Sequence, residues 1–423
     1  MPGMVWRVSC VVPHFSKKLI KTRLLCSSTP PTLWRLKSKV DERIAQGKLR
    51  GLTVINYASE VDFSSNDYLG LSRCKVVADN VRYEYETYLR QELGQPLSGS
   101  TGSRLLTGNS SLHEDTEIFL AQFHNQKYAL VANSGWDLNF GVCSSIPCAT
   151  SLVLFDELVH NSIIMGIRSG RQKLVESFIH NKVDDIINIF KKNPDVEDKL
   201  IIVESIYSMD GDQCPISDVL AIAKEHNAMV LVDEAHSVGV YGKRGEGLLC
   251  SLGLQNHPNL LGIIYTFGKA VGAHGAVITT NHEGVVEYLL NYCRPLVYST
   301  SLPAHSMITI RACYERMEKS IESRIKLFQN ILLFKKISAD VNLPLLSSDS
   351  MIQSVMIPTN DAVVAVAKVL REKGFACLPI RAPTVPIGSE RIRIIIHAQN
   401  TENEIRDLCN CLCSAIWKFN IKH

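Results

Sequence analysis

Short apolar runs alternate with longer helix-compatible stretches along most of the chain. Helix-like stretches such as Val183–Lys192 and Ser217–His226 separate several of these runs. The runs are Tyr128–Val131, Ser151–Phe155, Leu200–Val203, Met229–Val232, Leu261–Tyr265 and Ala276–Thr279. Apolar strands that alternate with helices predict an α/β fold with a mainly parallel sheet covered by helices. Because such sheets bind ligands beyond the carboxyl ends of their strands, the polar residues after each run are the candidates for function.

The pattern changes toward both ends of the chain. Thr32–Lys48 predicts a helix, and the alternation begins near Asp62. Beyond Pro303, a long helical segment from 304 to about 336 precedes two further strand-like runs, at 354–357 and 393–396. Thr401 and Glu404 have the spacing of a capping box that opens the last helix. We therefore expect a leader at 1–29, a helix and linker at 30–61, a large domain at 62–300 and a smaller C-terminal α/β domain at 301–423.

The charge of the chain is concentrated at its beginning. The net charge is +3, too small to indicate a nucleic-acid partner, yet residues 1–40 contain eight Lys or Arg and no Asp or Glu. We expect no membrane span, since no run reaches the roughly 18 apolar residues that a spanning helix needs. A basic, acid-free leader is typical of an organelle transit peptide. We expect a mitochondrial location, with a cytoplasmic or peroxisomal one as the alternative.

The cysteines do not indicate a disulfide framework or a metal site. Cys143, Cys148 and Cys377 lie in apolar surroundings, where a free thiol behaves as a small hydrophobe. Cys409, Cys411 and Cys413 alternate, but no further Cys or His completes the spacing of a zinc site. A reducing compartment and no bound metal are the expectations.

An acidic group ends the run at Met229–Val232. An Asp at the end of a buried strand, here Asp233, is costly unless it meets a cation, and a protonated pyridine nitrogen is such a cation. The string from Asp233 to His236 also occurs in helicases. A helicase would need a Gly-x-x-x-x-Gly-Lys-Ser/Thr loop upstream, which this sequence lacks.

Lys269 follows the run at Leu261–Tyr265 and is surrounded by small residues. Gly268, Ala270, Gly272 and Gly275 are its neighbours in the sequence. Such crowding indicates a chain that approaches a ligand closely. A Lys amine buried among small groups has a lowered pKa and can form a Schiff base, whereas a solvated surface lysine is the plain alternative.

The third group, Asn133–Trp136, lies between the run at Tyr128–Val131 and a helix-like stretch. Backbone N–H groups at a helix start bind anions such as phosphate, although an ordinary turn would explain these residues if they stood alone. Together the three groups provide an anion site, a ring counter-ion and a Schiff-base lysine.

Longer strings surround these groups and carry a family resemblance. They are Phe63–Leu71, Gly99–Gly108, Asp156–His160, Glu204–Asp212, Tyr298–Pro303 and Arg381–Pro386. On these strings the chain, from about 62 to 407, resembles the α-oxoamine synthases of the class-II aminotransferase superfamily. These are fold-type I enzymes that depend on pyridoxal 5′-phosphate (PLP). The string Gly99–Gly108 and the motif within Phe63–Leu71 are most similar to the oxononanoate-forming branch.

The resemblance implies a role for each matching residue. Lys269 would hold PLP, Asp233 would pair with its ring nitrogen, His236 would bond its phenolic oxygen, and His160 would stack on its ring. The other residues expected at the cofactor are Gly135, Trp136, Ser208, Thr266, Ser299 and Thr300. Of these, the last two would reach the phosphate of a neighbouring subunit, which implies a homodimer with shared sites. The expected substrate-binding residues are Arg50, Arg381 and Thr384.

The implied activity is the decarboxylative condensation of L-alanine with a pimeloyl thioester of CoA or acyl carrier protein. A sibling activity is the alternative, with glycine or serine and another acyl-CoA. Examples are 5-aminolevulinate synthase, glycine C-acetyltransferase and serine palmitoyltransferase. A degenerate, inactive partner subunit is a further alternative, but such a subunit would be expected to lose Lys269.

Overall fold

The computed structural model describes residues 30–91 and 94–419, so the expected leader at 1–29 lies outside the described residues. The chain divides into two compact units between Leu52 and Thr53. Helix α1 (Pro31–Ala45) is the helix that the structure describes in the first unit, and none of its residues is buried. It begins with Pro31, whose missing N–H costs nothing at a helix start. It ends three residues before the predicted Lys48, because Gly47 adopts a positive φ of 63°.

The second unit contains a seven-stranded sheet with the strand order β2-β8-β7-β6-β5-β3-β4. Strand β8 is antiparallel to both of its neighbours, and the other adjacent pairs are parallel. The strands are β2 (Tyr128–Ala132), β3 (Leu152–Asp156), β4 (Leu174–Phe178), β5 (Lys199–Glu204), β6 (Met229–Asp233), β7 (Leu260–Thr266) and β8 (Ala276–Thr280). The predicted mainly parallel α/β fold is therefore confirmed. The sequence pattern missed β4, an edge strand whose Leu174 and Val175 are exposed.

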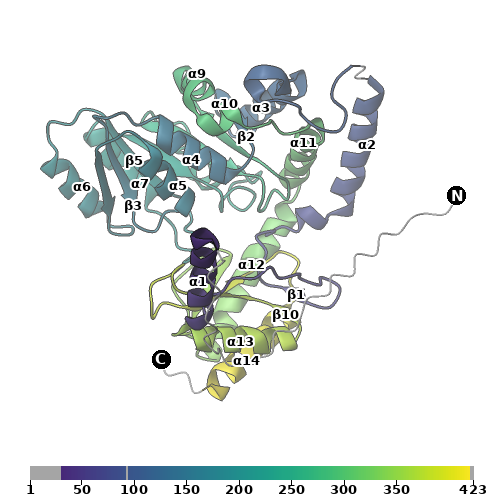
Figure 1. The fold of residues 1–423 in the computed structure, drawn as a ribbon. Coiled ribbons are helices and arrows are strands. Elements are labelled where there is room, and N and C mark those ends of the chain that lie inside the picture. The colour runs from purple at the N-terminus through teal and green to yellow at the C-terminus, as the bar shows by residue number, and fades with distance from the viewer. Residues whose placement is uncertain (1–29, 92–93, 420–423) are drawn as a thin grey trace. The chain divides into compact units, whose positions relative to one another are not determined.

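Helices cover the strands of this sheet. The helix α4 packs on β7 and β8, α6 packs on β4, and α7 packs on β6. Figure 1 shows α4, α5 and α7 alongside β3 and β5. Burial on both faces explains why β5 and β6 are apolar over most of their length. The helices of this part are α2 (Lys75–Gln91), α3 (Ser111–Phe123), α4 (Gly135–Ser145), α5 (Asn161–Ser169), α6 (Val183–Lys192), α7 (Ile216–Glu225), α8 (Leu248–Ser251), α9 (Glu283–Tyr292) and α10 (Arg294–Tyr298).

The C-terminal part of the second unit has its own small sheet, with the order β11-β12-β9. A separate parallel pair joins β1 (Val61–Asp62) to β10 (Phe375–Ala376). The remaining elements are α11 (Ala304–Glu318), α12 (Ile321–Asp340), β9 (Ile352–Met356), α13 (Asn360–Glu372), β11 (Leu378–Ile380), β12 (Arg391–Ile395) and α14 (Glu402–Lys418). The predicted capping box between Thr401 and Glu404 opens α14. The predicted domain boundaries stay predictions.

The helical segment predicted from 304 to about 336 is helical except at Lys319 and Ser320, where a break separates α11 from α12. The side chain of Arg324 donates hydrogen bonds to the carbonyl oxygens of Met317 and Glu318 at the end of α11. The Ser320 hydroxyl donates to the Arg316 carbonyl over 2.7 Å. These side-chain donors satisfy carbonyl groups that a continuous helix would have bonded to its own backbone.

Candidate active site

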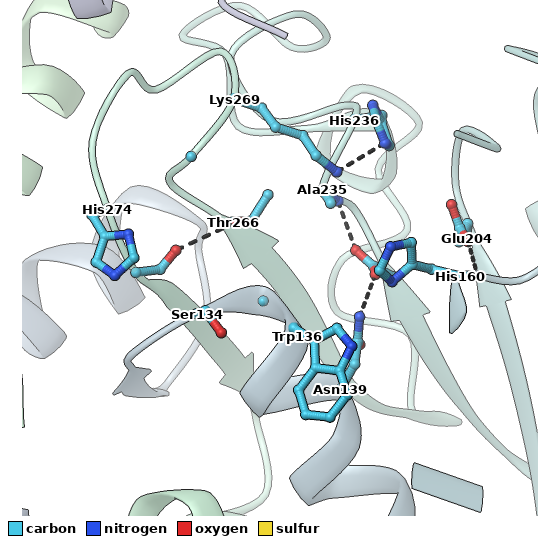
Figure 2. A pocket seen from close by; sticks show the side chains of 14 residues that line it. Ser134, Trp136, Asn139, His160, Glu204, Ala235, His236, Thr266, Lys269 and His274 are labelled. Carbon is cyan, nitrogen blue, oxygen red and sulfur yellow. Dashed lines mark hydrogen bonds between the residues drawn. The ribbon is translucent and has the colours of Figure 1, made fainter. Parts of the chain in front are cut away.

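The carboxyl ends of β2, β3, β5, β6 and β7 meet at one edge of the sheet, because these strands run in the same direction. Strand β8 runs in the opposite direction and so begins at this edge, which adds the residues just before it. A cavity of about 280 Å³ opens here, close to the lower end of the range for small-molecule sites, about 300 Å³. Its lining residues are Ser134, Gly135, Trp136, Asn139, His160, Glu204, Asp233, Ala235, His236, Thr266, Gly268, Lys269, His274 and Gly275 (Figure 2).

Asp233 ends β6, and only 5% of its surface is exposed. Its Oδ1 accepts the backbone N–H of Ala235 over 2.8 Å, and its Oδ2 accepts Nδ2 of Asn139 over 2.7 Å. A carboxylate has about four acceptor positions, so these two bonds leave capacity for a further donor from the cavity. The residue can therefore hold a cationic N–H group, as the sequence predicted for a pyridine nitrogen.

Lys269 lies in the loop after β7 and contacts His236. Its Nζ is 2.8 Å from Nε2 of His236 (Figure 2). Burial lowers the pKa of Lys269 to about 8, although the nearby carboxylates of Asp233 and Glu204 act in the opposite direction. Burial and the charge of Lys269 lower the pKa of His236 well below 6.5, so this ring is neutral. A lowered pKa increases the fraction of the amine that carries a free lone pair near neutral pH, which a nucleophile or a base requires.

Tyr68 determines which nitrogen of His236 carries the proton. Its hydroxyl oxygen lies 2.6 Å from Nδ1 of His236 but 3.3 Å from Oδ1 of Asn66. Burial raises the pKa of Tyr68, so the phenol keeps its proton and donates it to the nearer acceptor, Nδ1. When Lys269 is a neutral amine, the ring of His236 then carries its own proton on Nε2, the nitrogen that faces Lys269.

His160 forms the opposite wall of the cavity and caps α5. Its Nδ1 accepts the backbone N–H of Ser162 over 3.3 Å and lies 2.7 Å from the hydroxyl oxygen of that residue. The carboxyl group of Glu204 accepts the backbone N–H of His160. Burial raises the pKa of Glu204 to about 8, and the charge of Asp233 adds to this effect. The side chain of Glu204 thereby helps to position His160, a role that the sequence did not assign.

The start of α4 forms the anion-binding end of the cavity. The hydroxyl of Ser134 accepts the backbone N–H of Asp137 over 3.0 Å, so Ser134 is the N-cap of α4. A side chain at Gly135 would come within 3.3 Å of the side chain of Thr266, which explains the glycine. The N–H groups at this helix start, together with the Thr266 hydroxyl, could hold a phosphate.

The structure does not bring all of the predicted residues into this cavity. Ser299 lines a small neighbouring cavity, and the carbonyl oxygen of Thr300 accepts Nδ2 of Asn133 over 2.8 Å. Arg381 and Thr384 lie in the loop between β11 and β12 and are not among the lining residues. Arg50 belongs to the first unit. The roles that the resemblance implies for these residues stay predictions.

Ser208 lies in the loop after β5 and is not among the residues that line the cavity, and the C-terminal part of the chain holds this loop at four successive residues. The carbonyl oxygen of Ser208 accepts Nε of Arg393 over 2.7 Å, and the carbonyl oxygen of Met209 accepts the Ser354 hydroxyl over 2.9 Å. Next along the loop, Asp210 pairs with Arg391, and the carbonyl oxygen of Gly211 accepts the hydroxyl of Ser348. The side chains of the C-terminal part therefore set the position of Ser208.

Besides Glu204 and His274, three residues that act on the titratable groups of the site had no role in the sequence prediction. They are Asn139, Tyr68 and Arg393, whose charge lowers the pKa of Lys269. Asn139 is a buried polar residue on α4, and that exception to the apolar pattern was the available signal. Tyr68 lies within a string that carried the family resemblance, whereas Arg393 looked like part of a strand. Within the described ranges, no group of three or more His, Cys, Asp or Glu side chains is arranged to hold a metal ion.

The fold and the site together define a class of protein, the fold-type I PLP-dependent transferases. The residues of the cavity fit PLP: Lys269 provides an amine, Asp233 a buried carboxylate with spare acceptor capacity, and the start of α4 an anion site. In the part of the chain that the structure describes, no helix is long and apolar enough to cross a bilayer.

The chain belongs to the aminotransferase class I and II family, whose model matches residues 58–412. It is 36% identical over 387 residues to the 8-amino-7-oxononanoate synthase of Emericella nidulans, which covers 86% of this chain and 91% of that protein. Its homologues are PLP-dependent enzymes of the acyltransferase and aminotransferase type, so this protein is an enzyme of that type.

Two solved structures extend the likeness. The serine palmitoyltransferase of S. paucimobilis, with a bound PLP–myriocin adduct, has a TM-score of 0.82 and 25% identity, over 92% of this chain and 98% of that one. The 8-amino-7-oxononanoate synthase of Francisella tularensis has a TM-score of 0.72 and 25% identity, over 86% of this chain and all of that one (100%). Both branches considered from the sequence are thus represented among the similar structures.

Proposed function

We propose that this enzyme binds PLP at Lys269 and condenses L-alanine with a pimeloyl thioester, with loss of CO₂, to give 8-amino-7-oxononanoate for biotin synthesis. One observation carries the cofactor proposal: the Lys269 amine, the Asp233 carboxylate and the start of α4 line a single cavity. When bound, PLP supplies an electron sink for the negative charge that develops at Cα of the amino acid.

The residues of the chain then have separate tasks. Lys269, with its lowered pKa, takes the Cα proton and later returns it. Asp233 holds the ring nitrogen in its protonated form through charge and a hydrogen bond. His236 would present its Nε2–H to the phenolic oxygen of PLP, because Tyr68 occupies Nδ1. His160 would pack against the ring of PLP, and the N–H groups at the start of α4 would hold its phosphate.

The relatives support the choice of substrates. The relative from Emericella nidulans is an 8-amino-7-oxononanoate synthase and matches over most of both chains. A pimeloyl chain ends in a carboxylate, which needs a cation or polar donors if it is buried. Arg50 is proposed for the acyl end, and Arg381 and Thr384 for the amino-acid end. The thioester is proposed to be carried by CoA or by acyl carrier protein.

The decisive experiment is a measurement of kcat/KM for alanine, glycine and serine against pimeloyl, succinyl and palmitoyl thioesters. The proposal expects the highest value for alanine with the pimeloyl donor. The pocket rejects the added hydroxyl of serine only weakly, by about a hundredfold or less. A higher value for any other pair would overturn the substrate proposal. The absence of a visible absorption band after incubation with PLP would overturn the cofactor proposal.

A serine palmitoyltransferase activity is the second candidate, because structures of that enzyme have a TM-score of 0.82 against 0.72 for the Francisella tularensis synthase. A fold likeness at 25% identity carries less information on substrates than a relative at 36% identity. The same kinetic panel separates the two, since only this candidate expects palmitoyl-CoA with serine to give the highest kcat/KM.

We propose that the enzyme is a homodimer with shared sites, in which Ser299 and Thr300 act on the partner subunit's cofactor. A mixture of two inactive variants, Lys269→Ala and Thr300→Ala, tests this arrangement, because a mixed dimer would regain one intact site. Recovered activity in the mixture is expected. A monomer in sedimentation, or no recovery in a mixed dimer, would overturn the proposal.

A mitochondrial location is proposed from the basic, acid-free leader at 1–29. Import of the full-length chain into isolated mitochondria, but not of a chain that begins at residue 30, is the expected result. Import of both chains, or of neither, would overturn the proposal.

A further inference from the structure

The amide group of Asn139 connects Asp233, on one wall of the cavity, to Ser162, which contacts His160 on the opposite wall. Asn139 donates one hydrogen to Oδ2 of Asp233 over 2.7 Å and the other to the hydroxyl oxygen of Ser162 over 3.1 Å. The side chain of Asn139 is almost wholly buried, and Ser162 is fully buried. Because an ionised carboxylate only accepts hydrogen bonds, the group that faces Asp233 must be the NH₂ of the amide. The orientation of the amide therefore follows from its partner.

The bond from Asn139 also sets the direction of the next bond in the chain. The Ser162 oxygen accepts from Asn139, so its own proton can go to Nδ1 of His160, 2.7 Å away. The backbone N–H of Ser162 points to the same nitrogen over 3.3 Å, and a backbone N–H can only donate. Nδ1 is thus an acceptor from two directions, and neutral His160 must carry its proton on Nε2.

We propose that Asn139 is a positioning residue: it holds Asp233 and His160 in a fixed relation across the cavity and keeps His160 in its Nε2–H form. The inference rests on the proposed function in one respect, since it takes Asp233 and His160 to act on the PLP ring. Without the amide, Oδ2 of Asp233 loses its donor, and the Ser162 hydroxyl is free to rotate away from His160. Ser162 and Asn139 also lie on the neighbouring helices α5 and α4, so the amide sets both walls at once.

A purely structural role would have a different signature, and the chain contains a matched control. Asn330 is also fully buried, and its amide also donates twice, to the carbonyl oxygens of His397 and Asn400 over 2.9 and 2.8 Å. In both residues Oδ1 is buried without a hydrogen-bond partner. Replacing either by alanine removes the same groups, but only Asn139 is connected to the cavity.

The experiment compares Asn139→Ala, Ser162→Ala and Asn330→Ala in the full chain. The first readout is the ¹⁵N spectrum of the His160 ring in cofactor-free protein. We expect the proton on Nε2 in the wild type and in Asn330→Ala, and a larger share of the Nδ1–H form in the other two variants, where the longer 3.3 Å bond from the backbone N–H of Ser162 is the remaining fixed donor to Nδ1. The second readout is the Kd for PLP. It should rise about tenfold or more in Asn139→Ala, because a hydrogen bond to a charged group is lost. In Ser162→Ala it should stay within about threefold, because Asp233 keeps its donor, while kcat falls by about tenfold or less.

A wild-type His160 with its proton on Nδ1 would overturn the proposal directly, even if Asn139→Ala failed to fold. Equal losses of PLP affinity and kcat in Asn139→Ala and Asn330→Ala would overturn it as well, since the effect would then be one of stability. Failure of the wild type to bind PLP would count against the proposed function instead, while the spectrum of the cofactor-free protein still decides the role of Asn139.

Discussion

Two clusters at the same edge of the sheet each contain a histidine, and one of these rings is charged whereas the other is neutral. His180, just after β4, lies between two carboxylates: Nδ1 is 2.8 Å from Asp156 and Nε2 is 2.6 Å from Asp212. These partners raise the pKa of His180 to about 10, although burial acts in the opposite direction. His236 meets a phenol and an amine, and its pKa falls well below 6.5. Burial disfavours the charge in both rings, so the chemistry of the partners decides the outcome.

The two clusters have different roles: the charged one holds two loops together, and the neutral one contains the reacting amine. The charged cluster of His180, Asp156 and Asp212 joins the loop that leads to His160 to the loop that contains Ser208. It forms an ion pair that is retained across the physiological range. The neutral cluster, named for the uncharged ring of His236, also contains Tyr68 and Lys269. The lowered pKa of Lys269 increases the fraction of its amine that has a lone pair, as a reaction requires.

The largest effect is expected for Lys269→Ala, which removes the reacting amine of the neutral cluster. Turnover and the visible band of bound PLP should both disappear, because no other amine takes the place of Nζ next to His236. Absorption spectra and kinetic assays measure these losses, and circular dichroism should show an unchanged fold. A variant that still forms a borohydride-reducible linkage to PLP would contradict the assignment.

A large loss of stability is expected for His180→Gln, which removes the cation of the charged cluster. Asp156 is fully buried, and an unpaired buried carboxylate costs about 3–5 kcal/mol. The free energy of unfolding in urea measures this loss. His113→Gln is the control, because His113 is a buried but neutral ring whose pKa burial lowers to about 4. Equal losses in both variants would mean that the charge of His180 is unimportant.

A smaller effect is expected for Tyr68→Phe, which leaves Nδ1 of His236 without its donor. The ring can then carry its proton on either nitrogen, so Lys269 can remain an ammonium group that donates to Nε2. We expect kcat to fall by about tenfold, in line with one lost hydrogen bond.

The acid limb of the pH–rate profile of Tyr68→Phe should also move to higher pH. Asp233, Glu204 and Arg393 face the same amine and stay unchanged in this variant. Tyr314→Phe is the control, because it removes a buried bond of the same kind, 3.1 Å long, to His124. An unshifted profile would show that Tyr68 has no influence on His236.

The most gradual effect is the pH dependence of stability. The folded pKa of His180 is raised from 6.5 to about 10, so its contribution is complete below pH 6.5 and is lost as the pH rises through about 10. The difference between wild type and His180→Gln should shrink over this window by about 1.4 kcal/mol per pH unit. His113 and His124 have folded pKa values lowered to about 4 and about 3, so they reduce stability as the pH falls below 6.5. Unfolding curves between pH 4 and pH 10 measure both limbs, and a constant difference on the alkaline limb would refute the assignment.

The sequence predicted much of the fold, because buried parallel strands are apolar along their whole length. Six strands of the large sheet appear close to their predicted limits, and α6 spans its predicted range, Val183–Lys192. The edge strand β4 was missed because half-exposed strands lack that signal. The break between α11 and α12 was missed because Arg324, which caps α11, comes four residues after the break and looks like an ordinary helical residue.

The site was predicted in part, for a related reason. Residues that follow a strand within a few positions, such as Asp233, His160 and Lys269, could be placed at one edge from the direction of the strands alone. Tyr68, Asn139 and Arg393 reach the site from other elements, and their roles depend on contacts between residues that are far apart in the chain.

By itself, the sequence determined the class of fold, the family and the chemical groups available at the edge of the sheet, since these follow from local patterns and from strings of adjacent residues. Only the tertiary structure decided which histidine is charged and which is neutral. The residues next to His180 and His236 in the sequence do not reveal which ring is charged. Their pKa values move in opposite directions because Asp156 and Asp212 surround one ring, whereas Tyr68 and Lys269 surround the other. A charge state depends on the nearest groups in space, and folding brings those groups together from distant parts of the chain.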